Sequence, residues 1–508
     1  MARKRFVHLP RRLIFTAVAS LTVGAASISA SATVSNPEAT AALTVGAATV
    51  SASATYTGSD SMEFNGWVVP ASNGLVDVSV YIATATKVVY VDSSKADDSG
   101  DGLSEANAKK TIAAGAALIV DGQHHILLLK RGGTWTESIP SGKGGLSATE
   151  PLIYAAYGTG ARPLLKTGSS TGMQSISGTQ AHVIIQGIEF YAHTRDPNSP
   201  DFVGSAGGTG IRWLANFENL MIEDCVIRFY IVNLDINNGG TGIVNLVVRR
   251  CVSLDSYSTD SHSQGMFMKG VTGATIEDNF LDHNGWNEQV AGAEATVFNH
   301  NFYLSSGNFN VIVRRNIGAR ASSHGMQLRS GGLSNDNLFV NNSLAATLGN
   351  SADLGVIARN DVILEGKNIT TELPRGFGYG FYEDVESHTQ TSVLMEDCIF
   401  AHRAEGTMHA INLDVAIAEV LNRNIVYDWS TTNPAGTGTG NAILTDNEFA
   451  LPAGTYVDPT RSMGSYNGTL GGTATLAAFL ADCRTNFPNN GYDAISANAY
   501  IRAGFAHA

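Results

Sequence analysis

The sequence predicts an all-β chain folded as a solenoid of stacked coils, and three observations lead to this prediction. A line of alternating apolar residues, two often charged residues and then Asn or Cys recurs, as at Leu220–Ile227 (LMIEDCVI) and Leu246–Ser253 (LVVRRCVS). The Asn or Cys stands at positions 225, 251, 279, 316, 342, 398, 424 and 447, so most intervals lie near 26 residues and the interval of 56 fits two coils. Alternation with period two indicates strands, and a strand repeat of this length is typical of a solenoid. The 54 glycines suit many tight turns between strands.

The recurring Asn or Cys is predicted to lie inside a corner of each coil. Stacked coils place equivalent residues about 4.8 Å apart, so an Asn there can bond the next coil. Cys225, Cys251 and Cys398 occupy the same position and would fill the same small volume. We therefore expect buried thiols, with a disulfide between Cys225 and Cys251 as the alternative.

The two residues before each corner carry charges that alternate in sign from coil to coil. These pairs are Glu223-Asp224, Arg249-Arg250, Glu277-Asp278 and Arg314-Arg315. Opposite charges on neighbouring strands attract and like charges repel. The pairs are therefore predicted to stabilise the stack of coils and not to form a reactive site.

Composition limits the classes of function. The net charge of −13 argues against a nucleic-acid-binding protein. The four cysteines and thirteen histidines show no zinc-like spacing, so no metal or other cofactor is expected. No apolar run reaches the ~18 residues of a membrane span.

Residues 1–86 are predicted to form a separate β-rich module or arm, almost free of charge after Arg12. The basic and apolar start, residues 1–32, resembles a secretory signal. Against this, Leu21–Val34 (LTVGAASISASATV) is nearly repeated at Leu43–Tyr56 (LTVGAATVSASATY), and a cleaved signal has no reason to share a repeat with the mature chain. A retained arm that attaches to other proteins is the favoured interpretation.

From Lys87 onward the sequence resembles a known family. The run YVDSS…DDSGDGLS…KTIAAG…ILLLKRGGTWTESI…IYAAYGTGARPLL is similar to the opening of bacterial and phage proteins with the pectate-lyase-like right-handed parallel β-helix. Gly468–Phe505 resembles the helical C-terminal cap of some of these proteins. The resemblance implies a right-handed parallel β-helix at 87–450 and a C-terminal cap at 451–508. The helical spacing within Ala106–Leu118 predicts a helix that caps the start of the solenoid. The resemblance says little about function, because lyases, hydrolases, epimerases and adhesins share this fold.

A second strand recurs between the corners, as in QGMFMK (Gln264–Lys269) and HGMQLR (His324–Arg329). Aligning its copies places every second residue on the outer face of one sheet. The predicted outward residues are Asp235, Phe267, Lys269, Tyr303, Gln327, Arg329, Arg359, Tyr382, Asp384, Asn412 and Asp414. We refer to this set as the outer strip.

The outer strip combines residues that suit an acidic polysaccharide. Aromatic faces suit sugar rings, and Lys or Arg suits a uronate carboxylate. A polysaccharide lyase could use Lys269 or His300 as the base and Arg329 to neutralise the carboxylate. A hydrolase could instead use two carboxylates, for which Asp384 and Asp414 are the candidates. Trp286, in a neighbouring loop, could line one side of a sugar-binding site.

Structural interpretations of the same residues stay open. An outward strand carries charged and aromatic residues on any solvated sheet. His300, His324 and His409 begin their strands in register, which suits a polar stack at a corner.

Three functions are compatible with these patterns. The first is a phage tailspike or fibre in the virion, attached to other virion proteins through residues 1–86 and binding, or also cleaving, host surface polysaccharide. By analogy it would be a homotrimer. The second is a secreted bacterial polysaccharide lyase or glycoside hydrolase. The third is a non-catalytic adhesin or capsid decoration protein.

Overall fold

The computed structural model divides the chain into two compact units, Met1–Asp60 and Ser61–Ala508. It describes residues 15–508 apart from 24–25, 35–39, 46–47, 54–59, 141, 239–241, 350–354, 370–376, 381–392, 405–409, 413–418 and 430–441.

The first unit contains two antiparallel hairpins. Strands β1 (Phe15–Val23) and β2 (Ala26–Val34) pair in one, and β3 (Thr40–Val45) and β4 (Ala48–Ser53) pair in the other. The first strand of each hairpin ends on the repeated Leu-Thr-Val, at Leu21–Val23 and Leu43–Val45. Each copy of the sequence repeat therefore supplies the closing end of one hairpin.

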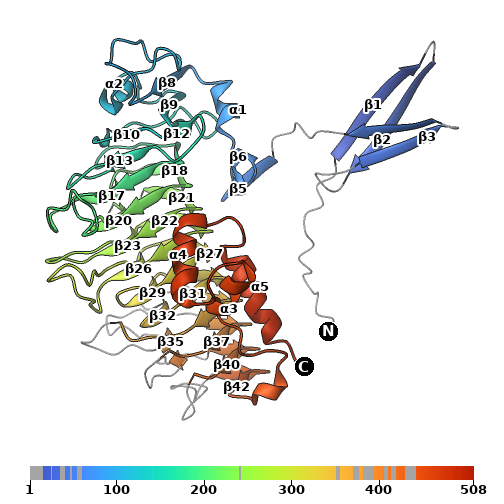
Figure 1. Cartoon of the computed structure of the whole chain (residues 1–508), viewed down its shortest axis with the longest axis vertical. Helices are drawn as coiled ribbons and strands as arrows, with labels where there is room; N and C mark the ends of the chain where they lie inside the picture. Colours follow the sequence, from blue (N-terminus) through green and yellow to red (C-terminus); the bar gives the residue numbers. More distant parts are fainter. Residues whose placement is uncertain are drawn as a thin grey trace. The chain divides into compact units, whose positions relative to one another are not determined.

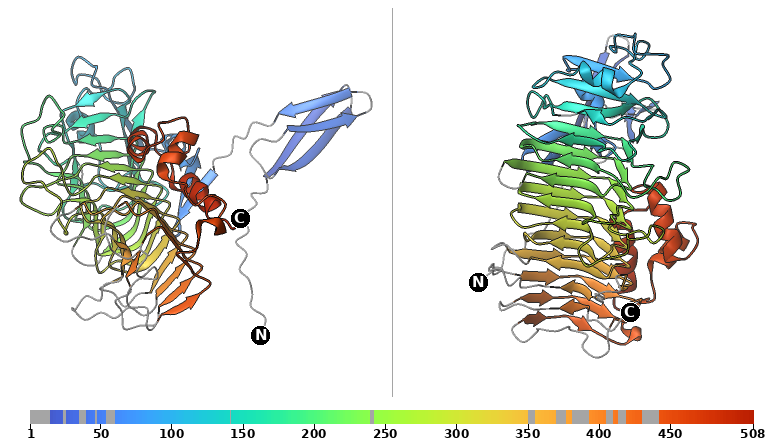
Figure 2. Two further views of the ribbon diagram at one scale, coloured as in Figure 1. Left: turned by 60° about the horizontal axis from the view of Figure 1, so that its bottom comes forward. Right: turned by 90° about the vertical axis from the view of Figure 1, so that its left-hand side faces the viewer.

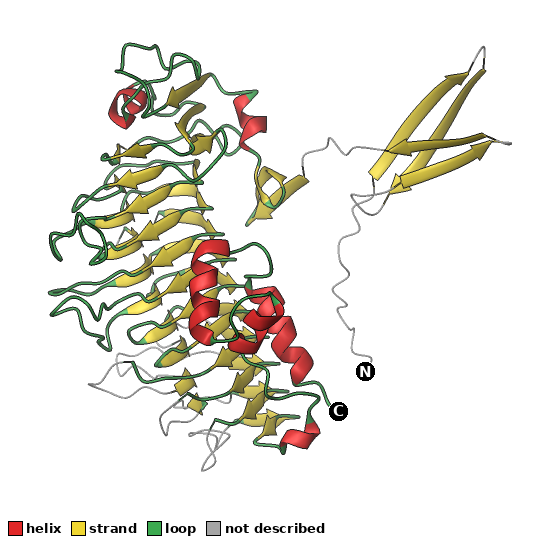
Figure 3. Ribbon diagram, viewed as in Figure 1, coloured by secondary structure: helices red, strands yellow, loops and turns green. Residues whose placement is uncertain are grey.

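The second unit is a parallel β-helix, as predicted, and each coil gives one strand to each of three sheets (Figures 1 and 3). In the described residues the thirteen-stranded sheet contains β8 (Lys87–Val91), β9 (His125–Lys130), β12 (Leu152–Tyr157), β15 (Val183–Gln186), β18 (Phe217–Glu223), β21 (Ile243–Arg249), β24 (Val271–Glu277), β27 (Phe309–Arg314), β30 (Gly332–Asn335), β33 (Val356–Arg359), β36 (Val393–Glu396), β39 (Val420–Asn422) and β41 (Ile443–Thr445).

The other two sheets complete each coil. Over the same residues the twelve-stranded sheet contains β10 (Thr134–Trp135), β13 (Leu164–Lys166), β16 (Glu189–Tyr191), β19 (Val226–Arg228), β22 (Val252–Leu254), β25 (Phe280–Asp282), β28 (Ile317–Ala319), β31 (Leu338–Val340), β34 (Val362–Leu364), β37 (Ile399–Ala401), β40 (Ile425–Tyr427) and β42 (Glu448–Phe449). The ten-stranded sheet, likewise counted over the described part, contains β11 (Ile139–Pro140), β14 (Met173–Ser175), β17 (Thr209–Trp213), β20 (Val232–Asn237), β23 (Gln264–Lys269), β26 (His300–Leu304), β29 (His324–Leu328), β32 (Leu344–Leu348), β35 (Phe377–Gly380) and β38 (Ile411–Asn412).

A ladder of small polar residues and cysteines lies inside one corner of the coils. The Asn316 side chain accepts hydrogen bonds from the backbone and side-chain nitrogens of Asn279, at 3.0 and 2.9 Å, and donates to the carbonyl oxygen of Ile276. Cys225, Cys251 and Cys398 are free, buried thiols, so the disulfide alternative is wrong. The ladder satisfies backbone groups that the bend removes from the sheets.

The sequence alignment of this corner is wrong after Asn316. The side-chain oxygen of Asn337, not that of Asn342, accepts from the backbone nitrogen of Asn316, and Asp361 follows Asn337. Asn342 lies at the next corner, where its side-chain oxygen accepts from the backbone nitrogen of Ala321. The coil from Asn316 to Asn337 spans only 21 residues, so an interval near 26 selects the wrong asparagine.

The alternating charges before the corner form the predicted ladder of ion pairs. Glu277 pairs with Arg249 at 3.0 Å and with Arg314 at 2.6 Å, and Arg249 also pairs with Glu223. Burial by itself raises the pKa of Glu277, but the surrounding arginines outweigh burial and the pKa is lowered. The residues directly before the corner, such as Asp278 at φ 53°, have left-handed backbones, which Asp and Asn adopt more readily than most residues.

Residues 61–82 pack against the β-helix, which differs from the predicted domain boundary after residue 86. They form part of β5 (Asp60–Phe64), together with β6 (Trp67–Ser72), β7 (Leu75–Val76) and α1 (Val78–Ile82). They cover aliphatic side chains on the outer face of the thirteen-stranded sheet, including Ile153, Ile184 and Met221. The backbone nitrogen of Val76 also donates to Glu223 at 2.9 Å. An apolar outer face is thus removed from water by the segment that precedes it.

Helices complete the second unit at its start and along its side. Helix α2 (Ile112–Ala117), within the predicted helical segment, buries Ile112 and Ala116 against the first coils. Helices α3 (Met463–Thr469), α4 (Leu476–Asn486) and α5 (Ala494–Gly504), with the 3₁₀ turn Ala453–Thr455, follow the last strand.

The C-terminal helices run back along the side of the β-helix instead of closing its end (Figure 2). The outward positions of the twelve-stranded sheet are aliphatic or aromatic over many coils and are buried with these helices. They include Val252, Phe280, Ile317, Leu338, Val362 and Ile399. Covering this apolar face removes it from water, and this hydrophobic effect explains why the C-terminal segment runs back along the twelve-stranded sheet. None of the helices in the described residues is both long and apolar enough to span a membrane.

Replacing Asn316 by Ala tests the corner ladder. The change leaves the buried backbone nitrogen of Asn279 and the carbonyl oxygen of Ile276 without these partners. Each such group costs roughly 1–3 kcal/mol, so we expect the free energy of unfolding to fall by at least ~2 kcal/mol in urea titrations. Thr272→Ala, at an exposed position of neighbouring β24, should change it by less than ~0.5 kcal/mol. Equal effects of the two variants would contradict a stabilising ladder.

Candidate functional site

The outer strip is continuous on the ten-stranded sheet through its first coils. Strand pairing brings Arg212, Asp235, Phe267, Tyr303 and Gln327 into one line, each in register with the next. All five are partly exposed, whereas alternate residues such as Met268 and Leu304 are buried in the core. The period-two alternation of these strands therefore separates core from surface as the sequence indicated.

Aromatic rings occupy the middle of the outer strip. The rings of Phe267 and Tyr303 lie edge to face with centroids 5.2 Å apart. Nη1 of Arg329 donates to the Tyr303 hydroxyl at 3.1 Å. The pair presents a partly exposed apolar surface with a cation at its edge.

Two cations flank a small residue beside these rings. Lys269 follows Met268 and Arg329 follows Leu328, and the coil between them has Ser305 at the same place. Two coil steps separate Lys269 from Arg329, which is about 10 Å. An anionic group above Ser305 would lie between the two positive side chains.

At the other end of the strip, Asp235 lies beside Arg212, which the sequence alignment missed. Nε of Arg212 is 3.4 Å from a carboxylate oxygen of Asp235. Burial raises the pKa of Asp235, and Arg212 opposes this only in part. The alternation of apolar Ile211, charged Arg212 and apolar Trp213 is the sequence signal that could have identified this strand. In the structure only Arg212 of the three is not buried.

Three further predicted site residues do not belong to the exposed line. Arg359 is on β33 of the thirteen-stranded sheet and pairs with Glu396 at 2.5 Å. The sequence alignment placed it on the ten-stranded sheet because the corner after Asn316 was misassigned. In the ten-stranded sheet the strand that follows β29 is β32. His300 is only 3% exposed, and its ring meets the rings of His324 and Tyr303 edge to face, with centroids 4.5 and 5.1 Å apart, so it lies beside the strip but is covered. Trp286 lies in the loop after β25 and donates to the carbonyl oxygen of Arg320.

The remaining predicted residues belong to the later coils. Tyr382, Asp384 and Asp414, and also His409, lie outside the described residues. Asn412 is in β38 and pairs with Gly380, but its side chain is not described. The carboxylate pair proposed for a hydrolase therefore stays a prediction.

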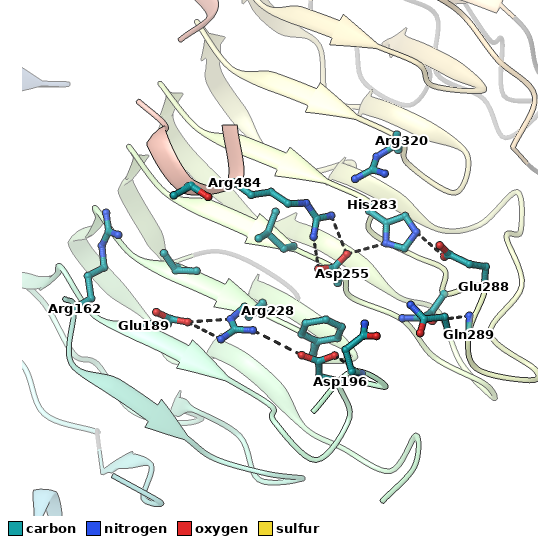
Figure 4. A pocket seen from close by; sticks show the side chains of 16 residues that line it. Arg162, Glu189, Asp196, Arg228, Asp255, His283, Glu288, Gln289, Arg320 and Arg484 are labelled. Carbon is teal, nitrogen blue, oxygen red and sulfur yellow. Dashed lines mark hydrogen bonds and ion pairs between the residues drawn. The ribbon is translucent and has the colours of Figure 1, made fainter. Parts of the chain in front are cut away.

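A charged pocket of about 630 Å³ lies where α4 meets the twelve-stranded sheet (Figure 4). On one side Arg228 pairs with Glu189 at 2.9 Å and stacks over the ring of Tyr191. On the other side Arg484 of α4 binds Asp255 through two hydrogen bonds of 2.8 and 2.9 Å. No sequence pattern indicates this contact, because Arg484 and Asp255 are 229 residues apart.

The charges of this pocket are paired with one another. Asp282 accepts from both Arg320 and Arg484, at 2.6 Å each. His283 bridges Asp255 at 2.8 Å and Glu288 at 2.9 Å. Burial on its own lowers the pKa of His283, but its two carboxylate partners outweigh burial and raise the pKa to about 9. A protonated histidine held between two carboxylates is not available as a base at neutral pH, and it shares Asp255 with Arg484 of α4.

Metal chemistry has no candidate in the part of the chain that the structure describes. There, no three His, Cys, Asp or Glu side chains are grouped so that they could hold a metal ion. Over its described residues the outer strip offers aromatic rings, cations and the carboxylate of Asp235.

No protein-family model matches the chain, and no curated protein matches its sequence. Among solved structures it is similar to pectate lyase Pel9A, with 14% identity, a TM-score of 0.41, and coverage of 74% of this chain and 86% of the other. It is also similar to the GH136 lacto-N-biosidase from Eubacterium ramulus (11% identity, TM-score 0.39, coverage 72% and 68%) and to the Dettilon tailspike protein (14% identity, TM-score 0.37, coverage 71% and 68%). Pectate lyase and tailspike are parallel β-helix proteins, as this chain is.

Replacing His283 by Gln tests whether its two carboxylate partners hold the histidine protonated. Because its pKa is raised above the ~6.5 of an unfolded histidine, the ion pairs contribute their full stability below about pH 6.5 and lose it as the pH rises through about 9. Urea titrations should therefore show His283→Gln clearly less stable than the wild type at pH 6 and close to it at pH 10. His262→Gln, at an exposed position, should show no such pH dependence. A stability loss that does not change with pH would contradict a protonated His283.

Proposed function

We propose that the outer strip binds an acidic polysaccharide. The observation that carries this proposal is the partly exposed Phe267–Tyr303 ring pair with Lys269 and Arg329 beside it. A sugar ring stacks on an aromatic face through its C–H surface, and a guanidinium binds a carboxylate in a fork. Successive coils repeat at about 4.8 Å, so the strip offers equivalent contacts at regular steps along an extended chain.

Cleavage of the bound chain is a further part of the proposal. Lys269 and Arg329 lie two coils apart on the same outward line, where one could take a proton and the other neutralise the uronate. His300 is left out of this role because it is buried. Hydrolysis by Asp384 and Asp414 is the alternative, and a non-catalytic adhesin is the outcome if no product forms.

In this proposal the protein works at a particle or cell surface. A phage tailspike or fibre, with residues 1–86 contacting other virion proteins, is the favoured setting, and a secreted enzyme is the alternative. The similar structures include a tailspike and a pectate lyase, which agrees with both settings.

A homotrimer is proposed from the outer face of the thirteen-stranded sheet. Residues 61–82 cover one half of its aliphatic line, and the line continues through Ile312, Leu333 and Ile357 to Ile443. Ile357 is 37% exposed and Ile443 is 54% exposed. A second copy of the chain would extend the covering of this apolar face.

Binding should depend on the ring pair. We expect Phe267→Ala to weaken binding to polygalacturonate, alginate or hyaluronan at least fivefold in calorimetry, since losing the apolar contact with a sugar ring costs about 1–3 kcal/mol. Arg329→Ala should weaken it and reduce its salt dependence. The matched control is Phe309→Ala, which removes an exposed aromatic side chain from the thirteen-stranded sheet. Wild-type protein that binds none of these polymers, or Phe267→Ala that binds like the wild type, would contradict the proposal.

Product formation separates the catalytic alternatives. A lyase leaves an unsaturated uronate with an ultraviolet absorbance, whereas a hydrolase releases reducing ends without it. Bound polymer that stays intact identifies a binding protein.

The oligomeric state is measured by light scattering on the full chain. A trimer that becomes a monomer on Ile357→Lys, with unchanged circular dichroism, supports the proposed contact. A monomeric wild-type chain would contradict it.

A further inference from the structure

A second pocket, of about 680 Å³, lies at the start of the ten-stranded sheet. It is formed around β11, β14 and the turn after β14, and its rim includes Ser138, Pro140, Gln174 and Ile176. None of the interactions of the outer strip described above uses this pocket.

Strand register places the pocket on the same line as the outer strip. Pro140 pairs with Gln174, and Gln174 pairs with Arg212, which is in register with Asp235 of the strip. Gln174 is thus one coil from Arg212 and three coils from Phe267, and three coil steps are about 14 Å. A chain lying along the strip and extended by a few units would reach the pocket.

The chemistry of the pocket differs from that of the strip. Among the described residues its lining is uncharged, and its polar groups are hydroxyls and amides, including those of Ser138, Ser170, Thr171, Gln174 and Gln180. Hydroxyl and amide groups both donate and accept, which matches the hydroxyl and acetamido groups of a neutral sugar. A uronate carboxylate would instead bind Lys269 and Arg329, because the guanidinium of Arg212 beside the pocket already faces the carboxylate of Asp235.

The inner side of the pocket is held by its own hydrogen bonds. Ser138 donates to the carbonyl oxygen of Thr171 at 2.5 Å. Gln180, which is 6% exposed, donates to the carbonyl oxygen of Ser177 at 2.7 Å and accepts from the hydroxyl of Ser175. Side chains that are already ordered lose little entropy on binding. Exposed Ile176, at 58%, adds an apolar surface at the rim.

We infer that this pocket is a subsite for a neutral sugar unit of the same polysaccharide that the outer strip binds. The ligand is therefore a heteropolysaccharide in which acidic and neutral units occur together, and not a uronate homopolymer. This inference rests on the proposed function, because the strip supplies the acidic end of the same site.

Two probes of equal length test the inference, each long enough to reach from Tyr303 to Gln174. One is a hyaluronan oligosaccharide, which alternates an acidic with a neutral N-acetylated sugar, and the other is an oligogalacturonide, which is acidic throughout. Calorimetry of the full-length protein should show hyaluronan binding at least tenfold tighter. Binding of the oligogalacturonide that is equal or tighter overturns the subsite.

Variants of exposed Gln174 sharpen the test without disturbing the core. Gln174→Ala should weaken hyaluronan binding about fivefold and leave oligogalacturonide binding unchanged, as loss of about one hydrogen bond to the neutral unit requires. Gln174→Arg should reverse part of the preference, because a guanidinium in the pocket favours a carboxylate.

The outcomes separate this inference from the proposed function. If both Gln174 variants bind like the wild type while Phe267→Ala does not bind, the strip stands and the neutral subsite is overturned. If Phe267→Ala also binds like the wild type, or if the wild-type protein binds no acidic polymer, the proposed function is overturned and the subsite with it.

Discussion

The register between coils is the constraint on which the rest of this structure depends. Side chains such as Asn279, Asn316 and Asn337 bond from one coil to the next inside a corner, and each satisfies backbone groups that would otherwise be buried without partners. A slip of one residue would move every core side chain of a strand to the surface. The ladder therefore determines which residues point outward, and with them every surface that the protein can use.

The outer faces of the three sheets are covered to different extents because their compositions differ. The aliphatic face of the twelve-stranded sheet is covered by the C-terminal helices, which Arg484 fastens to Asp255 and Asp282. The thirteen-stranded sheet is covered over its first coils by residues 61–82. The ten-stranded sheet carries polar and aromatic residues in its outward line, so this face can stay in contact with water and needs no covering segment. It is the face on which a ligand can lie along the coils, and both the outer strip and the uncharged pocket are on it.

Prediction from the sequence succeeded where contacts lie between neighbouring coils. Period-two alternation identified the strands, and the charge alternation from Glu223 to Arg314 identified a stabilising ladder correctly. It failed where one coil is short. Asn342 was mistaken for Asn337, and this single error moved Arg359 onto the wrong sheet. Arg212 was missed because its strand precedes the first clear copy of the repeat.

The sequence by itself determined the stacked coils, the buried corner and the line Asp235, Phe267, Tyr303 and Gln327, because these follow from local alternation and from contacts one coil apart. Only the tertiary structure decided where the C-terminal helices lie and that His283 is held between Asp255 and Glu288. It also decided that Gln174 continues the line of Arg212. These contacts join irregular loops or distant segments, whose separations along the chain carry no period for a sequence pattern to reveal.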